Sequence, residues 1–288
     1  MVRPWAPFKA GPIRLFGTNK TSPADHSGKP YGRRQARGGN CLDPVRGCPF
    51  GDTNEGHGCP WGCYAKEAVV RYHILFSIPT PMVLREDLLR KDLRKLREDW
   101  VRIGVMGEPS YDWQLTLRTA RVCWEEGKRV VVVTRVFQPP QGHILEELAE
   151  LGATLNVSLC ALDPPEFLEP RRALLEEYLA MGGRAVMRLV TFAFRDPSLQ
   201  RRQEELSLWG GPVLEQPAKL LRTNPTFRLI RGELYRPAPS YVGKPRWLTA
   251  GPQLEGFPSC WGFCPSCPHK CLSVGPEAAL AVPEPHTA

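Results

Sequence analysis

Arg129-Val-Val-Val-Val-Thr134 is an unbroken run of β-branched residues flanked by polar ones, and it predicts a buried parallel strand. Three other apolar segments predict strands of the same kind, at 101–106, 154–160 and 184–190. Helical periodicity fills the sequence between and before these strands, at 64–76, 84–100, 113–126, 142–151 and 170–181. The middle of the chain is therefore expected to alternate strand and helix.

This alternation predicts consecutive βαβ units and a parallel sheet, which is an α/β fold. Right-handed crossovers of this kind form either a doubly wound open sheet or a full or partial barrel. No glycine-rich dinucleotide fingerprint opens any of the expected helices. In a barrel the functional side chains follow the carboxyl ends of the strands, so those positions are the informative ones.

Polar side chains do follow several of the expected strands. Gly107 and Glu108 come after the first strand, Thr134 and Arg135 end the second, Ser158 lies near the end of the third, and Arg188 lies on the fourth. Polar residues at strand ends often only cap the next helix. Their recurrence at the same end of several strands favours a shared site instead.

Eight of the ten cysteines fall into two short stretches, four between Cys41 and Cys63 and four in Cys260-Trp-Gly-Phe-Cys264-Pro-Ser-Cys267-Pro-His-Lys-Cys271. Thiols separated by two or three residues in loops rich in Gly and Pro are typical ligands of a metal ion or an iron–sulfur cluster. The other two cysteines, Cys123 and Cys160, stand alone in apolar segments and are expected to pack as small hydrophobes. The sequence thus predicts two inorganic centres.

The cellular compartment determines whether these cysteines are expected to form disulfides or to bind a metal. The first residues contain no apolar run of signal-peptide length, and no segment approaches the roughly 20 apolar residues of a membrane span. We therefore expect a cytoplasmic protein without a membrane partner. Disulfides are unusual there, which favours metal or cluster ligation over reduced, packed thiols.

The positive charge is concentrated near the start of the chain. The formal net charge is +8, and residues 1–40 hold eight Lys or Arg against one Asp, a surplus of seven. This basic N-terminal arm, with Arg33, Arg34 and Arg37 beside Tyr31, suits contacts with phosphates or single-stranded nucleic acid. A solvated tail explains the same composition.

The stretch Asp43-Pro-Val-Arg-Gly-Cys48, followed by Gly58-Cys59-Pro-Trp-Gly-Cys63-Tyr-Ala-Lys-Glu67, resembles the opening of radical S-adenosylmethionine enzymes. It looks closest to phage-associated radical-SAM-like proteins and is more distantly similar to the spore photoproduct lyase group. The resemblance covers about residues 40–195. It implies a partial (β/α) barrel, a 4Fe–4S cluster and reductive cleavage of S-adenosylmethionine to a 5′-deoxyadenosyl radical, with ferredoxin or flavodoxin as electron donor.

The same resemblance assigns roles to the strand-end residues. Gly107 and Glu108 stand where such enzymes bind the amino group of S-adenosylmethionine. Thr134, Arg135 or Ser158 would meet its ribose, and Arg188 would bind its carboxylate through a bidentate fork.

This chain departs from the family pattern at one ligand. The usual third thiol would stand at position 66, which is Lys66. The third ligand is then expected from Cys48, with Cys41 as a competitor. Because four thiolates would leave no iron open for S-adenosylmethionine, either Cys41 stays off the cluster or this centre is structural.

The C-terminal stretch repeats the family spacing at Cys260, Cys264 and Cys267, but at the wrong end of the chain. We expect these three and Cys271 to form a second centre with four thiolates, either an auxiliary 4Fe–4S cluster or a structural zinc site. His269 could replace one thiolate, although a solvated loop histidine is the simpler interpretation.

The sequence therefore predicts a radical S-adenosylmethionine enzyme whose substrate is open, with DNA or RNA favoured over a peptide or small molecule. The alternatives are a zinc- or cluster-containing nucleic-acid-binding protein without catalysis, and a ferredoxin-like electron carrier. The expected organisation is a basic arm at 1–40, the partial barrel with its cluster loop at 41–215, and a C-terminal extension with the four-cysteine site at 216–288.

Overall fold

The structure, a computed structural model, describes residues 6–15, 40–51, 59, 62–69, 73–238, 247–260 and 269–272. Its centre is a six-stranded sheet in which every pair of neighbours is parallel. The strands stand in the order β1 (Cys41–Leu42), β4 (Trp100–Ile103), β5 (Arg129–Thr134), β6 (Thr154–Leu159), β7 (Arg184–Thr191) and β8 (Val213–Pro217). The Arg129–Thr134 run is thus an interior strand, paired on both sides.

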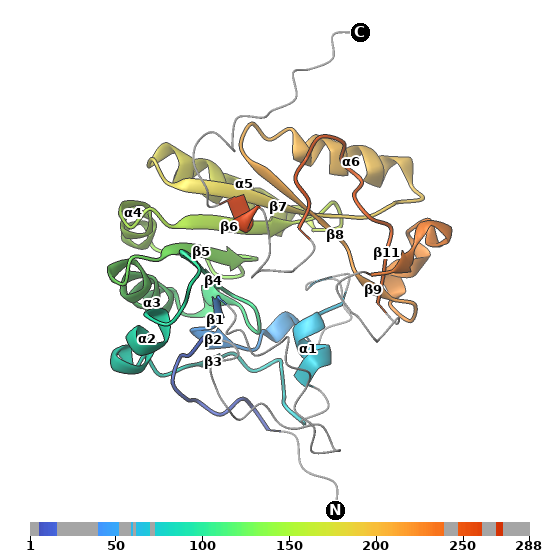
Figure 1. The fold of residues 1–288 in the computed structure, drawn as a ribbon. Helices are drawn as coiled ribbons and strands as arrows, with labels where there is room; N and C mark the ends of the chain where they lie inside the picture. Colours follow the sequence, from blue (N-terminus) through green and yellow to red (C-terminus); the bar gives the residue numbers. More distant parts are fainter. Residues whose placement is uncertain are drawn as a thin grey trace, which may run out of the picture.

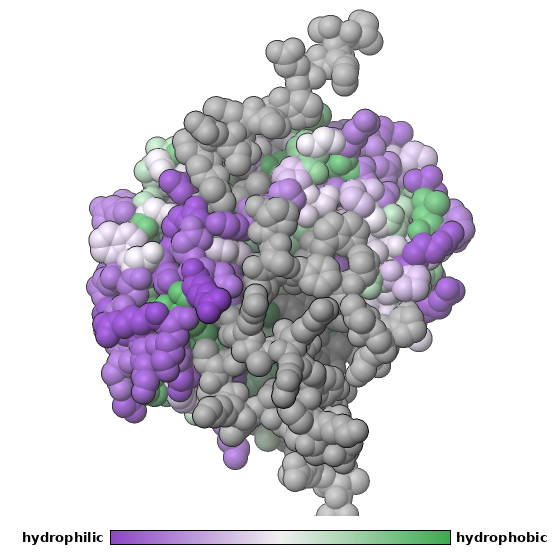
Figure 2. All heavy atoms as spheres, in the orientation of Figure 1, coloured by the Kyte–Doolittle hydropathy of each residue, from purple (hydrophilic) through white to green (hydrophobic). Residues whose placement is uncertain are grey.

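Five helices pack on one face of this sheet (Figure 1). They are α2 (Glu86–Leu93), α3 (Trp113–Glu125), α4 (Gly142–Glu150), α5 (Pro165–Ala180) and α6 (Pro197–Ser207). Alternate strand residues such as Val130, Val132 and Leu155 are buried against helix residues such as Ala120 and Leu148. The outer surfaces of α2 to α4 are hydrophilic (Figure 2), as expected for amphipathic helices.

The opposite face of the sheet contacts the cysteine-rich C-terminal segment. Val131 and Val133 form a small cluster with Cys271, and Val186 forms another with Cys260. Neither cluster contains a residue of helices α2 to α6. In the described part of the chain, helices α2 to α6 cover one face of the sheet, which agrees with the predicted partial barrel and differs from a doubly wound sheet with helices on both faces.

The expected elements exist, but their boundaries moved. The helix expected at 84–100 ends at Leu93, and Trp100 instead begins β4 with its side chain buried. The helix expected from 170 begins at Pro165, where a proline at the first helical position costs no hydrogen bond. Helix α1 (Tyr64–Val69) is shorter than expected, and His73 has a positive φ of 57°.

Two strands of the sheet were not anticipated. Strand β1 has only two residues, too few for a periodic pattern. Strand β8 crosses the expected domain boundary at 215/216, so the C-terminal extension shares the sheet of the barrel.

Smaller elements surround the sheet. Strands β2 (Val45–Arg46) and β3 (Thr80–Pro81) form an antiparallel pair, and β10 (Arg236–Pro237), β11 (Trp247–Thr249) and β9 (Leu220–Leu221) form a three-stranded sheet. Short 3-10 helices lie at Pro49–Gly51, Pro109–Tyr111, Pro225–Arg228, Gly232–Leu234 and Lys270–Leu272.

The start of the chain packs onto this body. Ile13 and Leu15 belong to the main core, and the Ile13 amide donates to the Val83 carbonyl at 2.9 Å. The guanidinium of Arg14 forms a two-point ion pair with Asp92, at 2.5 and 2.7 Å. Residues 6–15 are therefore part of the folded body, and the rest of the expected arm, including Arg33, Arg34 and Arg37, lies outside the described residues.

The segment before Cys260 is fixed to β8 through Glu215, whose side chain is fully buried. Its carboxylate accepts hydrogen bonds from the Gln253 amide, the Thr191 hydroxyl and the Ser259 hydroxyl at 2.5, 2.6 and 3.2 Å. Its backbone exchanges bonds with Pro258 and Cys260, which adds a short parallel bridge along this strand. Among the described residues no helix is long and apolar enough to cross a membrane.

Candidate functional site

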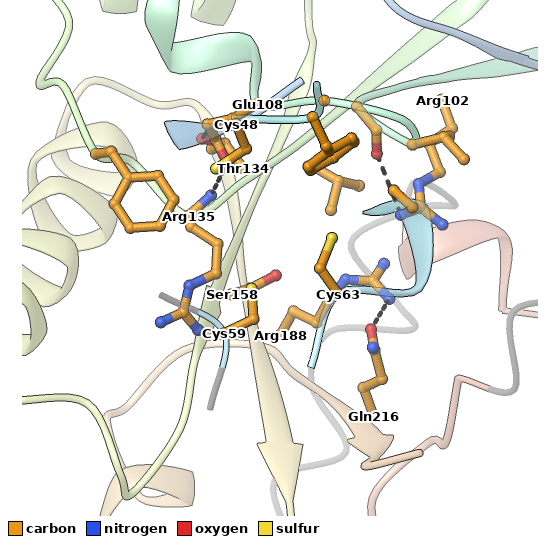
Figure 3. Close-up of a pocket in the computed structure, with 17 residues that line it drawn as sticks. Cys48, Cys59, Cys63, Arg102, Glu108, Thr134, Arg135, Ser158, Arg188 and Gln216 are labelled. Carbon is orange, nitrogen blue, oxygen red and sulfur yellow. Dashed lines mark hydrogen bonds between the residues drawn. The ribbon is translucent and has the colours of Figure 1, made fainter. Parts of the chain in front are cut away.

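A pocket opens at the carboxyl ends of the parallel strands, where side chains from several strand ends meet the cysteine loop (Figure 3). The sequence-predicted residues that line it are Cys48, Cys59, Cys63, Gly107, Glu108, Thr134, Arg135, Ser158 and Arg188. The structure thus brings together residues that are up to 140 positions apart in the sequence, since Cys48 and Arg188 line the same pocket.

Two glycines allow the cysteine loop to lie against the loop after β4. Gly47 and Gly107 form a parallel bridge, and the Glu108 amide donates to the Gly47 carbonyl at 3.3 Å. A Cβ atom on Gly47 would lie 2.5 Å from the Ile78 carbonyl oxygen, and one on Gly107 would lie 2.7 Å from the Arg46 Cα. Gly47 also has a φ of +86°, a region that favours glycine. The next residue of each loop, Cys48 or Glu108, therefore enters the pocket beside the other.

The loop before Cys48 is held by Asp43. Its buried carboxylate accepts the amides of Val105 and Met106 at 2.6 and 3.0 Å. Burial outweighs these bonds and raises the pKa of Asp43 to about 6. The carboxylate thus ties the segment after β1 to the loop after β4, close to the glycine crossing.

The pKa values of all three pocket cysteines are raised. Burial raises the pKa of the Cys48 thiol well above its usual range, with further contributions from Glu108, Cys59 and Cys63. Burial, followed by the charge of Cys59, raises the pKa of Cys63 to about 12. The pKa of Cys59 shifts in the same direction, again chiefly through burial. Burial therefore disfavours the thiolate form of all three cysteines.

This donor set fits an iron–sulfur cluster better than a single ion. No group of three or more His, Cys, Asp or Glu side chains within the described part of the chain could hold one metal ion. In a 4Fe–4S cluster each thiolate binds a different iron, so its ligands need not converge on one point. The three thiols that line this pocket in the described part of the chain are compatible with that requirement.

Glu108 is held rigidly at the pocket wall. Its buried carboxylate accepts hydrogen bonds from the Ser110 amide at 3.1 Å, the Arg135 amide at 2.9 Å and the Thr134 hydroxyl. An ionised carboxylate has about four acceptor positions. One acceptor position therefore remains for a donor in the pocket.

Positive charge surrounds Cys59. Arg135 and Arg171 both pair with the buried carboxylate of Asp163, at 2.5 and 3.1 Å, so this network has one more cation than anion. Burial and then the neighbouring Arg135 lower the pKa of Arg171 to about 10, which leaves it charged at neutral pH. The charges of Arg135 and Arg171 lower the pKa of the Cys59 thiol, whereas burial and the charges of Asp163 and Glu108 raise it.

Aromatic rings fix the start of the cysteine loop over this network. Phe50, two residues after Cys48, stacks on Phe137 with ring centroids 4.2 Å apart and meets Phe167 edge-on at 6.1 Å. The guanidinium of Arg171 lies 5.3 Å from the Phe137 ring centroid. The loop is thus seated on the chain segment that follows β5.

Arg188 is almost fully buried and donates in several directions. Its Nε donates to Asn156 at 2.7 Å and its Nη1 to Gln216 at 2.9 Å, the latter bond visible in Figure 3. Nη1 and Nη2 also donate to the sulfur atoms of Cys260 and Cys271, at 3.1 and 3.2 Å. Four of its five N–H groups are engaged, so a bidentate fork toward a carboxylate would require breaking one of these bonds.

The remaining predicted ligands lie elsewhere. Cys41 is buried on β1, 3.7 Å from the Asn40 side-chain oxygen, and it does not line the pocket. Cys264 and Cys267 lie outside the described residues. His269 does not line this pocket.

Several pocket residues were missed in the sequence. The polar ones are Arg102 on β4 and Gln216 on β8, and the apolar ones include Phe76 and Phe137. Arg102 alternates with buried apolar residues of its strand, a signal that could have placed it on the inner face. Gln216 could not be found because its strand was not recognised.

Comparison with known proteins gives only structural matches. No protein-family model matches the sequence, and no curated protein does. Two solved structures of spore photoproduct lyase variants are similar in structure. One, with bound AdoMet and dinucleoside spore photoproduct, has a TM-score of 0.46 at 13% identity and covers 72% of this chain and 66% of that chain. The other, with dinucleoside spore photoproduct, has a TM-score of 0.48 at 13% identity and covers 72% and 67%.

Proposed function

We propose that this chain is a radical S-adenosylmethionine enzyme that acts on nucleic acid. The observation that carries this proposal is the meeting of Cys48, Cys59 and Cys63 with Glu108 in one pocket at the carboxyl ends of parallel strands. The three thiolates would hold a 4Fe–4S cluster. Cys41, which lies outside the pocket, would stay off it.

When bound, the cluster would supply one-electron reductive cleavage of S-adenosylmethionine, with methionine as one product and 5′-deoxyadenosine as the other once a hydrogen atom has been taken from the substrate. The protein's contribution is binding, orientation and exclusion of water. Glu108 offers its remaining acceptor position to the ammonium group of S-adenosylmethionine. Because three donors already orient that carboxylate, little entropy is lost on binding.

The charges of the pocket suit a thiolate-ligated, anionic centre. Arg102 and Arg188 line its floor, and the network of Arg135, Asp163 and Arg171 adds positive charge near Cys59. Electrostatic interactions in a buried site are strong, so these cations stabilise negative charge there. Thr134 already donates to Glu108 and accepts from the Val136 amide, which leaves Ser158 as the stronger candidate for the ribose.

Nucleic acid is proposed as the substrate because of charge. The surplus of seven positive charges in residues 1–40 stands against a nearly neutral remainder of the chain. Arginine forks next to glycines and Tyr31 suit phosphate and base contacts. A cytoplasmic ferredoxin or flavodoxin would supply the electron.

Anaerobic reconstitution tests the proposal. With iron, sulfide and a chemical reductant, the protein should turn brown and convert S-adenosylmethionine to 5′-deoxyadenosine. A Cys59→Ser variant should lose this activity, whereas Cys123→Ser, a buried cysteine of α3 away from the pocket, should keep it. Colourless protein that binds zinc and nucleic acid but forms no 5′-deoxyadenosine would instead support the non-catalytic alternative.

A further inference from the structure

A second pair of cysteines meets a buried cation beneath the pocket. Cys260 and Cys271 are both buried, and their sulfur atoms lie 3.1 and 3.2 Å from the two terminal nitrogens of Arg188. The two cysteines come from opposite ends of the C-terminal cysteine stretch. One guanidinium group thus contacts both sulfur atoms.

The charge of Arg188 requires an anion. A guanidinium stays protonated in proteins, and burying it without a compensating charge is costly. Arg188 is 1% exposed, and no carboxylate in the described part of the chain forms an ion pair with it. Its other partners, Asn156 and Gln216, are neutral amides. The two sulfur atoms are therefore the groups that can carry the balancing negative charge.

Contacts with the sheet also fix the backbone around Cys271. Cys271 packs against Trp100, Val131 and Val133 on the inner face of the sheet, and its carbonyl accepts a bond from Asn156 at 3.4 Å. Lys270 and Cys271 both have positive φ, 42° and 55°, a conformation that surrounding contacts must impose on residues with side chains. The ammonium of Lys270 also reaches Asp99 at 3.3 Å.

We propose that Cys260 and Cys271 are thiolate ligands of a second inorganic centre, buried on the inner face of the sheet, and that Arg188 is its positioning residue. The shared chemistry is thiolate ligation, through which either a zinc ion or an iron–sulfur cluster is bound. Arg188 also lines the pocket of Cys48, Cys59 and Cys63, so it joins the two cysteine groups. Hydrogen bonds from a cation to ligand sulfur atoms orient the ligands and tune the metal.

This inference does not rest on the proposed function. It is tested in a background in which Cys48, Cys59 and Cys63 are replaced by serine, so that only the second centre remains. Zinc, iron and sulfide per chain are measured in the full-length protein. We expect about one zinc, or one cluster's iron and sulfide, to be retained in this background. Iron with sulfide identifies a cluster, and zinc alone identifies a zinc site.

Within that background, Cys260→Ser and Cys271→Ser should each release the centre, while Cys123→Ser, a cysteine buried on the other side of the sheet, should retain it. Arg188→Met should weaken retention against a chelator about 10- to 100-fold, the usual effect of removing an outer partner of a ligand. Arg188→Lys keeps the positive charge but loses the two-pronged guanidinium group, so its retention against the chelator should lie between that of Arg188→Met and that of the parent. Circular dichroism and thermal melting of each variant, compared with Cys123→Ser, show whether it is folded.

Three results would overturn the proposal. The first is a background protein that is folded but holds neither zinc nor iron. The second is full retention in Cys260→Ser or Cys271→Ser. The third is equal chelator resistance in the parent and in Arg188→Met. If Arg188→Met fails to fold, the comparison of Arg188→Lys with the parent decides, and unchanged resistance in that variant refutes the role of Arg188.

Discussion

The glycine crossing that sets Cys48 beside Glu108 can be tested with three single substitutions. Gly182→Ala changes only backbone conformation, because Gly182 has a φ of +79° and an added Cβ would meet no atom within 4 Å. Gly107→Ala causes only a steric clash, because the added Cβ would lie 2.7 Å from the Arg46 Cα and 2.9 Å from the Gly47 nitrogen. Gly47→Ala changes both the backbone conformation and the packing. Gly47 has a φ of +86°, and its added Cβ would lie 2.5 Å from the Ile78 carbonyl oxygen and 2.8 Å from the Phe76 carbonyl oxygen.

These differences give an order of effects. A side chain in the left-handed region costs roughly 1–2 kcal/mol, which is the expected loss for Gly182→Ala. Overpacking against backbone atoms, which cannot rotate away, costs about 1–3 kcal/mol, which is the expected loss for Gly107→Ala. Gly47→Ala combines both effects and should lose about 2–5 kcal/mol. Urea unfolding measures these losses.

The decisive measurement is iron retention. Gly182 lies between α5 and the amino-terminal end of β7 (Arg184–Thr191) and does not line the pocket at the carboxyl ends of the strands, so its alanine variant should bind as much iron as the parent. Gly107→Ala and Gly47→Ala push the two loops apart, so both should hold less iron even where the protein remains folded. If folded Gly107→Ala retained the full iron content, the crossing would not position the cysteine ligands and the reasoning would fail.

Three further predictions concern the ligands, a carboxylate and the basic segment. Cys48→Ala should abolish 5′-deoxyadenosine formation while Cys41→Ala keeps it, and the reverse pattern would exchange the two assignments. Asp43→Asn should flatten the stability profile between pH 4 and 6: the folded pKa of about 6 exceeds the ordinary value of 3.8, so folding takes up a proton in that window and stability falls as pH rises through it. A parent protein equally stable at both ends of this window would contradict that account. Neutralising Arg33, Arg34 and Arg37 with glutamine should weaken nucleic-acid binding and reduce the slope of log affinity against log salt by about 2–3, whereas an unchanged slope would leave the segment as a solvated tail.

Substitutions in the basic segment are preferable to truncation for a structural reason. Removing residues 1–40 would also remove Ile13 and Leu15 from the core and the Arg14 partner of Asp92. Loss of binding by such a truncated protein could then reflect unfolding rather than lost phosphate contacts.

The sequence was most informative where its signal was periodic or local. Strand β5 was recognisable because four valines in succession suit only a strand buried on both faces. Residues at strand ends could be placed in one pocket because parallel strands end at the same edge. Strand β8 was not recognised, since Val213–Pro217 contains Glu215 and Gln216, whose polar groups find partners only in the folded chain.

The relation between the two cysteine groups could not be predicted. Arg188 was expected at the pocket because it lies on the fourth expected strand, and it does line the pocket. Its contacts with Cys260 and Cys271 depend on a return of the chain to the inner face of the sheet, more than 70 residues later. No local pattern encodes such a return, because it results from packing against Val186 and Val131.

The attachment of residues 258–260 to Glu215 also bears on how the protein avoids self-association. Strand β8 is the last strand of the sheet, and an open edge strand presents unpaired backbone groups to other chains. The Glu215 amide donates to the Pro258 carbonyl, and the Cys260 amide donates to the Glu215 carbonyl, so the segment that leads into the C-terminal cysteines occupies part of that edge. Release of that segment, for instance by oxidation of its thiols, would uncover β8 and leave the molecule prone to edge-to-edge aggregation.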